Sequence, residues 1–234
     1  MGRAYFSFVV SGVSGLQSRN EPRCRRGFGT KVPKHLLLNT PAFRPDAGEI
    51  ILASASPRRK ELLSLVVADF RVVPSSFDEC EVPDSLGPSE HVLYSARMKA
   101  RDVAGRFPGS LVIGADTIVV VDDTILGKPV DAEDAAGMLR ALGGRTHQVY
   151  TGLAVVGDGK EESAYERTNV TFGALTEELI ARYVATGEPL DKAGAYAIQG
   201  RGSVLIESVS GCYFNVVGLP IYRLGILLEK FAHL

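Results

Sequence analysis

The stretch EIILASASPRRKELLSL, residues 49–65, decides how this chain is organised, because a buried strand there turns directly into a helix. Ile50 to Ala53 is a short apolar run, which is typical of a buried strand. Ser56 has the side chain of a helix N-cap, and Pro57 suits the first helical position. The chain therefore opens with a strand, a tight turn and a helix.

The first turn of this helix carries two arginines, Arg58 and Arg59. Cations at a helix N-terminus oppose the helix dipole, at a cost of roughly 0.3–1 kcal/mol each. The free N–H groups of a helix N-terminus bind anions, and a sequence that breaks a local rule often does so for a ligand. The pattern favours a polyanion such as a phosphate chain. Two solvated arginines on a surface helix are the alternative.

The composition indicates a folded protein whose charge is unevenly spread. The 234 residues are 45% hydrophobic and 23% charged, which allows one large or two small domains with a sizeable core. Residues 1–48 hold eight Lys or Arg and two acidic residues, whereas the rest of the chain holds 18 and 25. A nucleic-acid binder carries its positive charge on the folded body, so this acidic body argues against a nucleic-acid partner.

Residues 1–48 differ from the rest, and we expect a boundary between this basic extension and one domain at 49–234. The extension is rich in Arg and poor in acids, which is compatible with an organellar transit peptide. It is equally compatible with a disordered tail or with a start codon placed too far upstream. No apolar run approaches the roughly 20 residues of a membrane span, so we expect no membrane partner. The expected location is the cytoplasm, with an organelle as the alternative.

The segment after the first helix predicts a strand at 70–73, an acidic loop at 75–88 and a second helix. A loop this acidic is most often solvated, but carboxylates such as Glu79 hold Mg²⁺ when a phosphate lies near. Ser89 is predicted to cap the helix, which has an apolar face. Lys99 lies off that face, and periodicity alone predicts a solvated lysine.

Leu111 to Val121 is the most apolar segment and predicts a central strand. Asp116 and Thr117 interrupt it, and a buried Asp is costly unless it is paired or bound to a metal. An Asp that bonds a nearby turn is the structural alternative. The hairpin that follows is expected to bring Lys128 close to Asp116, because a tight turn brings strand ends together.

The rest of the chain alternates further strands and helices, which predicts an α/β fold with a mixed sheet. Residues 187–203 are Gly-rich and polar, and we interpret them as a binding loop that carries Asp191, Lys192 and Gln199. We expect helices after Asp131, around 179–184 and after Pro220, paired strands at 149–156 and 165–172, and a last hairpin of 204–209 with 213–217.

The polar residues at strand ends and in loops suggest phosphate chemistry. Cations neutralise a phosphate chain, carboxylates coordinate Mg²⁺ or Mn²⁺ or accept a proton, and an amide such as Gln199 suits a base edge. No Walker sequence and no G-x-S-x-G elbow is present. The histidines lack metal-ligand spacing, and His147 in a strand is interpreted as structural.

Several separate motifs resemble the Maf family of nucleoside triphosphate pyrophosphatases, in the family's order and spacing. They run from about Glu49 to about Phe231 and leave out the first 48 residues. The motifs are ILASASPRRKELL at 51–63, GADTIV at 114–119, GKP at 127–129, GEPLDKAGAYAIQG at 187–200 and NVVGLP at 215–220.

The resemblance implies a mixed, twisted α/β sheet with flanking helices and two lobes around a cleft, similar to the inosine triphosphatase-like fold. It implies hydrolysis of a nucleoside triphosphate to the monophosphate and pyrophosphate, with a divalent cation, Mg²⁺ or Mn²⁺. A homodimer is also implied.

The family's site residues are carried over position by position. The general-base aspartate matches Asp116, which with Glu79 also matches the metal site. The remaining phosphate-binding and metal-site positions match Ser54, Arg59, Lys99, Lys128 and Lys192, and three positions that separate the subfamilies match Arg58, Thr117 and Gln199.

SPRR, GADT and IQG look like the branch that acts on dTTP and UTP. The branch that acts on 7-methyl-GTP differs, with a Trp in place of Arg58 and Ser-Glu-Gly in place of residues 198–200. Two alternatives stay open: the same chemistry on a purine nucleotide, and a nucleotide-binding regulator of cell division without turnover.

Overall fold

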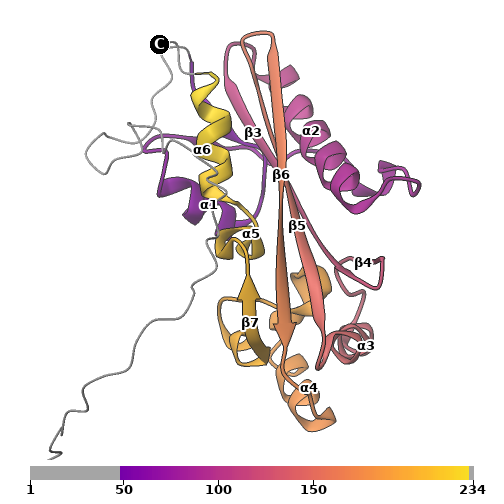
Figure 1. Cartoon of the computed structure of the whole chain (residues 1–234). Coiled ribbons are helices and arrows are strands. Elements are labelled where there is room, and N and C mark those ends of the chain that lie inside the picture. Colours follow the sequence, from indigo (N-terminus) through magenta and orange to yellow (C-terminus); the bar gives the residue numbers. More distant parts are fainter. Residues whose placement is uncertain (1–47, 232–234) are drawn as a thin grey trace, which may run out of the picture. The chain divides into compact units, whose positions relative to one another are not determined.

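The computed structural model describes residues 48–231, and it confirms the predicted mixed α/β fold. One sheet of seven strands runs in the order β2-β1-β3-β5-β6-β7, with β4 paired to β3 (Figure 1). The strands are β1 (Ile50–Leu52), β2 (Arg71–Val72), β3 (Leu111–Val121), β4 (Thr124–Leu126), β5 (Thr146–Gly157), β6 (Lys160–Phe172) and β7 (Ile206–Ser210).

Among the described residues, six α-helices and four short 3₁₀ segments accompany the sheet. None of the helices between residues 48 and 231 has both the length and the apolar character needed to cross a membrane. The α-helices are α1 (Pro57–Ser64), α2 (Pro88–Arg106), α3 (Ala132–Leu142), α4 (Glu177–Val184), α5 (Tyr213–Val217) and α6 (Ile221–Glu229). The 3₁₀ segments are η2 (Glu79–Glu81), η3 (Glu188–Asp191), η4 (Ala193–Ala195) and η5 (Arg201–Leu205).

The predicted opening unit is confirmed, and it places the first helix beside the central strand. β1 is parallel to both β2 and β3, and Leu52 lies opposite Ile113. Ser56 caps α1 with its side chain, and Pro57 takes the first helical position. Asp116 lies three residues beyond Ile113 on β3, so it continues past the end of β1, on the side where α1 begins.

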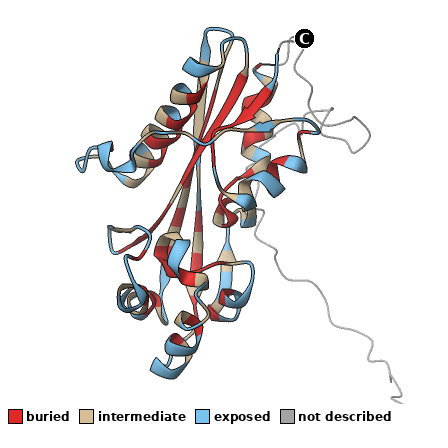
Figure 2. Ribbon diagram, turned by 180° about the vertical axis from the view of Figure 1, so that it is seen from behind, coloured by how far each residue is buried: buried red, intermediate tan, exposed pale blue. Residues whose placement is uncertain are grey.

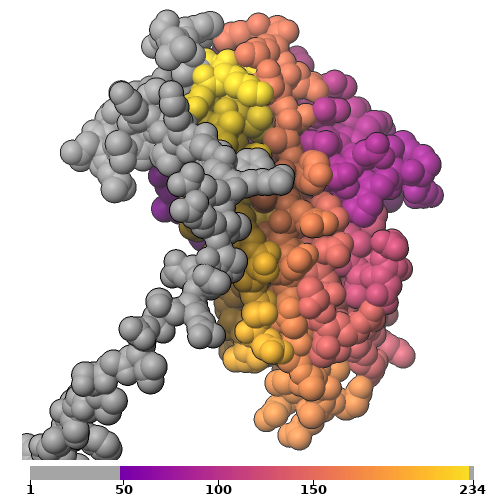
Figure 3. Space-filling model, viewed as in Figure 1, coloured from indigo at the N-terminus to yellow at the C-terminus, as the bar shows by residue number. Residues whose placement is uncertain are grey.

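The two faces of the sheet bury different side chains, as the alternation along a strand requires. Leu52 and Ile113 pack toward α1 and α6, whereas Ile51 and Val112 pack toward α2. A separate cluster surrounds Phe172 near α3 and α4, at the other end of the long strands (Figure 2). At the end that carries α1 and α6, Figure 3 shows α6 in yellow lying along the orange β6. The sheet thus has one hydrophobic core beside α1, α2 and α6 and another beside α3 and α4.

Two glycines allow α2 to lie directly on the sheet. A Cβ added to Gly114 on β3 would come within 2.3 Å of the Ala96 carbonyl oxygen. One added to Gly152 on β5 would come within 2.1 Å of the Val92 carbonyl oxygen. Both distances are far below van der Waals contact, so the backbone of α2 approaches the strands only because these positions lack side chains.

The predicted last hairpin is wrong. Residues 213–217 form helix α5, and the strand before it, β7, begins only at Ile206 and pairs with β6. The fully buried Asn215 holds the helix by donating to the Val149 carbonyl and to Thr168 Oγ1. Gly218, with φ of +118°, ends it in a left-handed conformation. These tertiary contacts override the strand propensity of the sequence Tyr-Phe-Asn-Val-Val.

Two predictions about α2 also need correction. Its N-cap is Gly87 rather than Ser89, because Pro88 takes the first helical position and Glu90 accepts from the Gly87 amide. Lys99 is only 8% exposed and is not a solvated lysine. Periodicity missed this because the long side chain of Lys99 extends from the edge of the buried face toward two carboxylates. Residues 1–47, and with them nearly all of the predicted N-terminal extension, lie outside the described residues.

Candidate functional site

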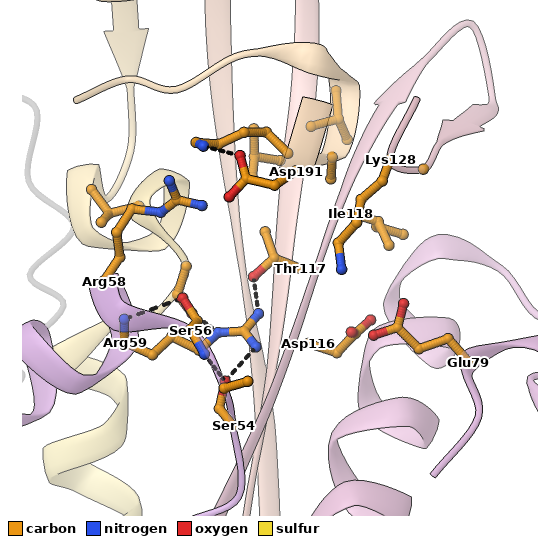
Figure 4. Close-up of a pocket in the computed structure, with 18 of the residues that line it drawn as sticks. Ser54, Ser56, Arg58, Arg59, Glu79, Asp116, Thr117, Ile118, Lys128 and Asp191 are labelled. Atoms are coloured by element: carbon orange, nitrogen blue, oxygen red, sulfur yellow. Dashed lines mark hydrogen bonds and ion pairs between the residues drawn. The ribbon is translucent and has the colours of Figure 1, made fainter. Parts of the chain in front are cut away.

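All ten predicted site residues line one cavity of about 660 Å³. It lies where the N-terminus of α1, the middle of β3 and the loop before α2 face the segment from η3 to Gly200 (Figure 4). The residues are Ser54, Arg58, Arg59, Glu79, Lys99, Asp116, Thr117, Lys128, Lys192 and Gln199. The sequence motifs, far apart along the chain, therefore meet in space.

One wall of the cavity, which we call the α1 wall, is built around the guanidinium of Arg59. Its Nε donates to the Gly218 carbonyl at 2.9 Å, Nη2 to Thr117 Oγ1 at 3.0 Å and Nη1 to Ser54 Oγ at 3.3 Å. None of these acceptors carries a charge, and within residues 48–231 Arg59 forms no ion pair. Burial lowers the pKa of Arg59 from its ordinary value, although the more distant Asp116 and Glu79 oppose that shift.

The hydroxyl of Thr117 has a fixed direction. Thr151 Oγ1 donates its only hydrogen to the Asn215 carbonyl at 3.0 Å, so in the 2.9 Å contact between the two threonines Thr117 must be the donor. Thr117 therefore accepts from Arg59 and donates to Thr151. Its hydroxyl hydrogen is already committed, and in this arrangement it holds Arg59 in place.

The opposite wall, the α2 wall, is built around Lys99. The Nζ atom of Lys99 donates to Asp116 Oδ1 and to Glu79 Oε1, each at 2.6 Å. Asp116 is only 6% exposed, so it is buried and paired, as the cost of burying a carboxylate predicted. The alternative, an Asp bonded to a nearby turn, is wrong.

The donor set on the α2 wall fits a divalent metal ion that is shared with a phosphate ligand. No group of three or more His, Cys, Asp or Glu gathers to hold a metal in the part of the chain that the structure describes. Mg²⁺ is usually bound through one or two carboxylates together with substrate phosphates and water. Glu79 and Asp116 supply two carboxylates that converge on one cationic atom, Lys99 Nζ.

The third side of the cavity carries the remaining cations. Lys128 follows the β3–β4 hairpin, and Figure 4 shows its side chain extending toward Asp116, as predicted. Lys192 Nζ donates to the Glu188 carbonyl at 3.1 Å and contacts the carboxylate of Asp191. The Gly194 amide donates to the Gly127 carbonyl at 3.0 Å and joins this segment to the residue before Lys128.

The cavity is cationic although the domain around it is acidic. Five Lys and Arg and three carboxylates line it, a balance of +2, whereas residues 49–234 hold 18 basic and 25 acidic residues. A local excess of positive charge in a concave site attracts polyanions. Arg58 and Arg59 both line this cavity. The alternative interpretation, two solvated arginines on a surface helix, therefore does not describe them.

Sequence reasoning missed part of the lining. Asp191, which was placed in the binding loop but not among the site residues, lies in the cavity beside Lys192, and the apolar side chains of Phe77 and Ile198 also line it. The position of Asp191 next to Lys192, a residue predicted to bind phosphate, was the available signal. The apolar residues gave none, because isolated apolar residues in a loop look the same whether they face a cavity or the core.

His147 takes no part in the cavity. It is fully buried on β5, and its Nε2 lies 2.8 Å from the Tyr196 hydroxyl. Burial lowers the pKa of His147 to about 4, so the imidazole is neutral at physiological pH. These contacts agree with the structural role predicted for it.

Comparison with known proteins gives one consistent family. The family model described as Maf-like protein matches residues 49–231. A dTTP/UTP pyrophosphatase of Pelotomaculum thermopropionicum is 52% identical over 187 residues, 79% of this chain and 97% of that protein. A dTTP/UTP pyrophosphatase of Symbiobacterium thermophilum is 53% identical over 186 residues, 79% of this chain and 95% of that protein.

Among solved structures, the Ham1 protein of Staphylococcus aureus aligns with a TM-score of 0.46 and 18% identity, covering 78% of this chain and 98% of that one. A HAM1 protein of Coxiella burnetii aligns with a TM-score of 0.45 and 14% identity, covering 78% and 99%. The match of the family model over most of the chain and the identity of about half to curated relatives agree on one assignment: this chain belongs to the Maf family.

Proposed function

We propose that this chain is a nucleoside triphosphate pyrophosphatase that hydrolyses dTTP and UTP to the monophosphate and pyrophosphate. Relatives about 50% identical carry the name dTTP/UTP pyrophosphatase. The observation that carries the proposal is the cavity itself, where the half-buried Arg59, which has no counter-ion among the described residues, faces Asp116 and Glu79, both bonded to Lys99. An arginine without a counter-ion can bind a polyanion, and a carboxylate can accept a proton from the water that hydrolyses it.

The cations of the cavity bind the substrate. Arg58, Arg59, Lys128 and Lys192 hold the triphosphate and neutralise the charge that develops on the leaving pyrophosphate. Arg59 is pre-oriented because three neutral acceptors already fix its guanidinium. An arginine so fixed presents its remaining donors to phosphate oxygens without further ordering.

Asp116 acts as the general base. Its carboxylate accepts the proton of a water molecule whose oxygen attacks the α-phosphorus, while the bond from that phosphorus to the bridging oxygen of the β-phosphate breaks. Pyrophosphate then leaves with the bonding electron pair. Lys99 holds the carboxylate at 2.6 Å and keeps it oriented within the wall of β3 and α2.

Glu79 and Asp116 would hold a divalent metal ion, Mg²⁺ or Mn²⁺. When bound, such an ion neutralises phosphate charge and acts as a Lewis acid. Gln199 lines the cavity from the segment between η4 and η5 and offers a donor and an acceptor to the edge of a pyrimidine.

A nucleotide panel tests this proposal. Pyrophosphate release is measured with dTTP, UTP, CTP, GTP and 7-methyl-GTP, each in Mg²⁺ and in Mn²⁺. We expect dTTP and UTP to have the highest kcat/KM. A preference for 7-methyl-GTP would support the purine alternative, and binding without any turnover would support the regulator.

The boundary of the catalytic unit is also a proposal. We place it at residues 49–234, since the family model begins at residue 49 and every lining residue of the cavity follows it. A chain that starts near Ala47 should keep activity within a few-fold of the full chain. Sedimentation of the same two proteins tests the expected homodimer.

A further inference from the structure

Glu188 connects helix α4 to the far end of the segment that supplies Asp191–Ala193 and Tyr196–Gln199 to the cavity, although the proposed mechanism gives it no role. Its Oε1 accepts from the Tyr183 hydroxyl at 2.9 Å and from the Gly202 amide at 3.0 Å. Its Oε2 accepts from the Arg201 amide at 3.0 Å. One carboxylate thus closes the segment from Glu188 to Gly202 into a loop, and Gln199 lies at the end of that loop.

The same network reaches the middle of the loop. The Tyr183 hydroxyl donates to Glu188 and accepts from the Ala197 amide at 3.1 Å. Gly200 has φ of +89°, and a Cβ added there would lie 2.7 Å from Glu188 Oε2. The carboxylate therefore lies directly against the backbone of the residue that follows Gln199.

The carboxylate is suited to this position because all three of its partners are donors. Partial burial would raise the pKa of Glu188, but the hydrogen bonds from the Gly202 and Arg201 amides and from Tyr183 outweigh burial and hold that pKa below its ordinary value. The backbone carbonyl of Glu188 also accepts from Lys192 Nζ, so one residue orients a phosphate-binding cation and the loop that faces the base.

We infer that Glu188, together with Tyr183, is a positioning residue that sets base selectivity by fixing the Ala197–Gly200 segment from behind. The inference rests on the proposed function, since it assigns a cause to the preference for dTTP and UTP. A side chain that recognises a base by hydrogen bonds must be held in a fixed position. Because Gln199 is exposed, its position depends on the backbone that carries it.

The test uses Glu188→Gln in the full chain. A glutamine has one acceptor oxygen and one NH₂ group, so either the Gly202 or the Arg201 amide must face a donor. We expect KM for UTP to rise about tenfold and the UTP-to-CTP ratio of kcat/KM to fall about tenfold, the size of one lost charge-assisted hydrogen bond. The kcat for UTP should change less than about threefold, because the cations and Asp116 stay in place.

Two matched controls separate this effect from a change of charge or of surface. Glu177→Gln removes a carboxylate at the start of α4 that is exposed and bonded only to Arg140 in the described structure. Tyr222→Phe removes the hydroxyl of an exposed tyrosine on α6. Both should leave KM and the UTP-to-CTP ratio unchanged. Gln199→Glu serves as the reference for a direct loss of base selectivity.

Tyr183→Phe provides a second, independent variant. It keeps the ring but removes the hydroxyl between Glu188 and the Ala197 amide, and it should shift the UTP-to-CTP ratio in the same direction as Glu188→Gln. An equal loss of activity on every nucleotide in both variants would overturn the inference and leave a purely structural role. Failure of both variants to fold would overturn it in the same way.

Amide hydrogen exchange distinguishes failure of this inference from failure of the proposed function. If the wild type releases no pyrophosphate from any nucleotide, the proposed function fails. The inference still predicts faster exchange at Ala197, Arg201 and Gly202 in Glu188→Gln, with weaker binding of a non-hydrolysable UTP analogue. Unchanged exchange and unchanged binding would refute it.

Discussion

The two walls of the cavity hold their cations in different ways. On the α2 wall, Lys99 donates to two carboxylates at 2.6 Å, so its charge is balanced within the protein. On the α1 wall, Arg59 donates to two hydroxyls and a carbonyl, and no carboxylate touches it among residues 48–231. In the proposed mechanism the first wall orients a general base, whereas the second keeps a positive charge available for the substrate. We therefore expect substrate binding and proton transfer to be separable by mutation.

The largest effect is expected from Asp116→Asn, which breaks the α2 wall alone. The amide keeps the size and one acceptor oxygen but cannot take a proton, so kcat should fall about 10²–10⁴-fold. Binding of dTTP or UTP should change little, because the α1 wall is intact. Steady-state kinetics and direct binding of a non-hydrolysable analogue measure the two quantities.

A parallel fall in affinity for the metal–nucleotide complex would identify Asp116 mainly as a metal ligand and leave Glu79 as the better base. Asp122→Asn, in the exposed β3–β4 turn, is the matched control and should leave both quantities unchanged.

A third basic side chain, His147, sharpens the comparison because it is fully buried outside the cavity and bonds to no carboxylate among residues 48–231. Burial lowers its pKa to about 4 from 6.5. Between these values the unfolded chain binds a proton that the folded chain does not, so the free energy of unfolding falls as the pH is lowered through this window. Full stability is present above about pH 6.5, and the loss approaches about 3 kcal/mol at pH 4.

Urea unfolding at pH 7 and at pH 4 measures this contribution. His147→Gln cannot titrate in either state, so its stability should change less between the two pH values than that of the wild type. An equal change in both proteins would show that His147 is not the group responsible.

An intermediate effect is expected from the two adjacent arginines of α1. Arg59→Lys loses the planar fork that contacts Ser54, Thr117 and Gly218, and kcat/KM for UTP should fall about 10–100-fold. Arg58→Lys keeps a charge that no intramolecular hydrogen bond fixes in the described structure, and the fall should be below about tenfold. Equal effects would mean that the contacts of Arg59 do not orient it for the ligand.

The smallest effect is expected from Thr151→Val, which removes the acceptor of the Thr117 hydroxyl and the donor to the Asn215 carbonyl. Of the two lost bonds only the one to Thr117 bears on Arg59, so kcat/KM should fall about three- to tenfold, the size of one neutral hydrogen bond. Thr146→Val is the matched control, because Thr146 and Thr171 form the same kind of pair at 2.8 Å on an exposed part of the sheet. It should leave kcat/KM unchanged.

The sequence was sufficient for most of the fold because local signals and long-range contacts agree there. The strand at 111–121, the turn at Asp122 and the capped helix after Asp131 all follow from periodicity, turn residues and caps. Residues 213–217 were mistaken for a strand because five residues are too short to show a period, and the buried Asn215 decides the conformation through contacts far away in the sequence.

The candidate site residues came from motifs, and their grouping in one cavity is what the structure adds. Periodicity placed Lys99 in solvent because it takes no account of a partner on another strand. Glu188 was passed over for a similar reason. The carboxylate of Glu188 accepts from three donors, two of them backbone amides 13 and 14 residues away. No local sequence pattern predicts such contacts.

The close approach of α2 to the sheet has a consequence for how this protein tolerates substitution. Gly152 lies opposite Asp116 in the β3–β5 pairing, and any side chain there would collide with the backbone at Val92. Helix α2 would have to move outward, carrying Lys99 away from its carboxylates. In a screen of random variants for activity, Gly152 and Gly114 would therefore score as essential, although neither contributes a functional group. A designer who transfers this cavity to another scaffold must keep glycine at both positions as strictly as the charged residues.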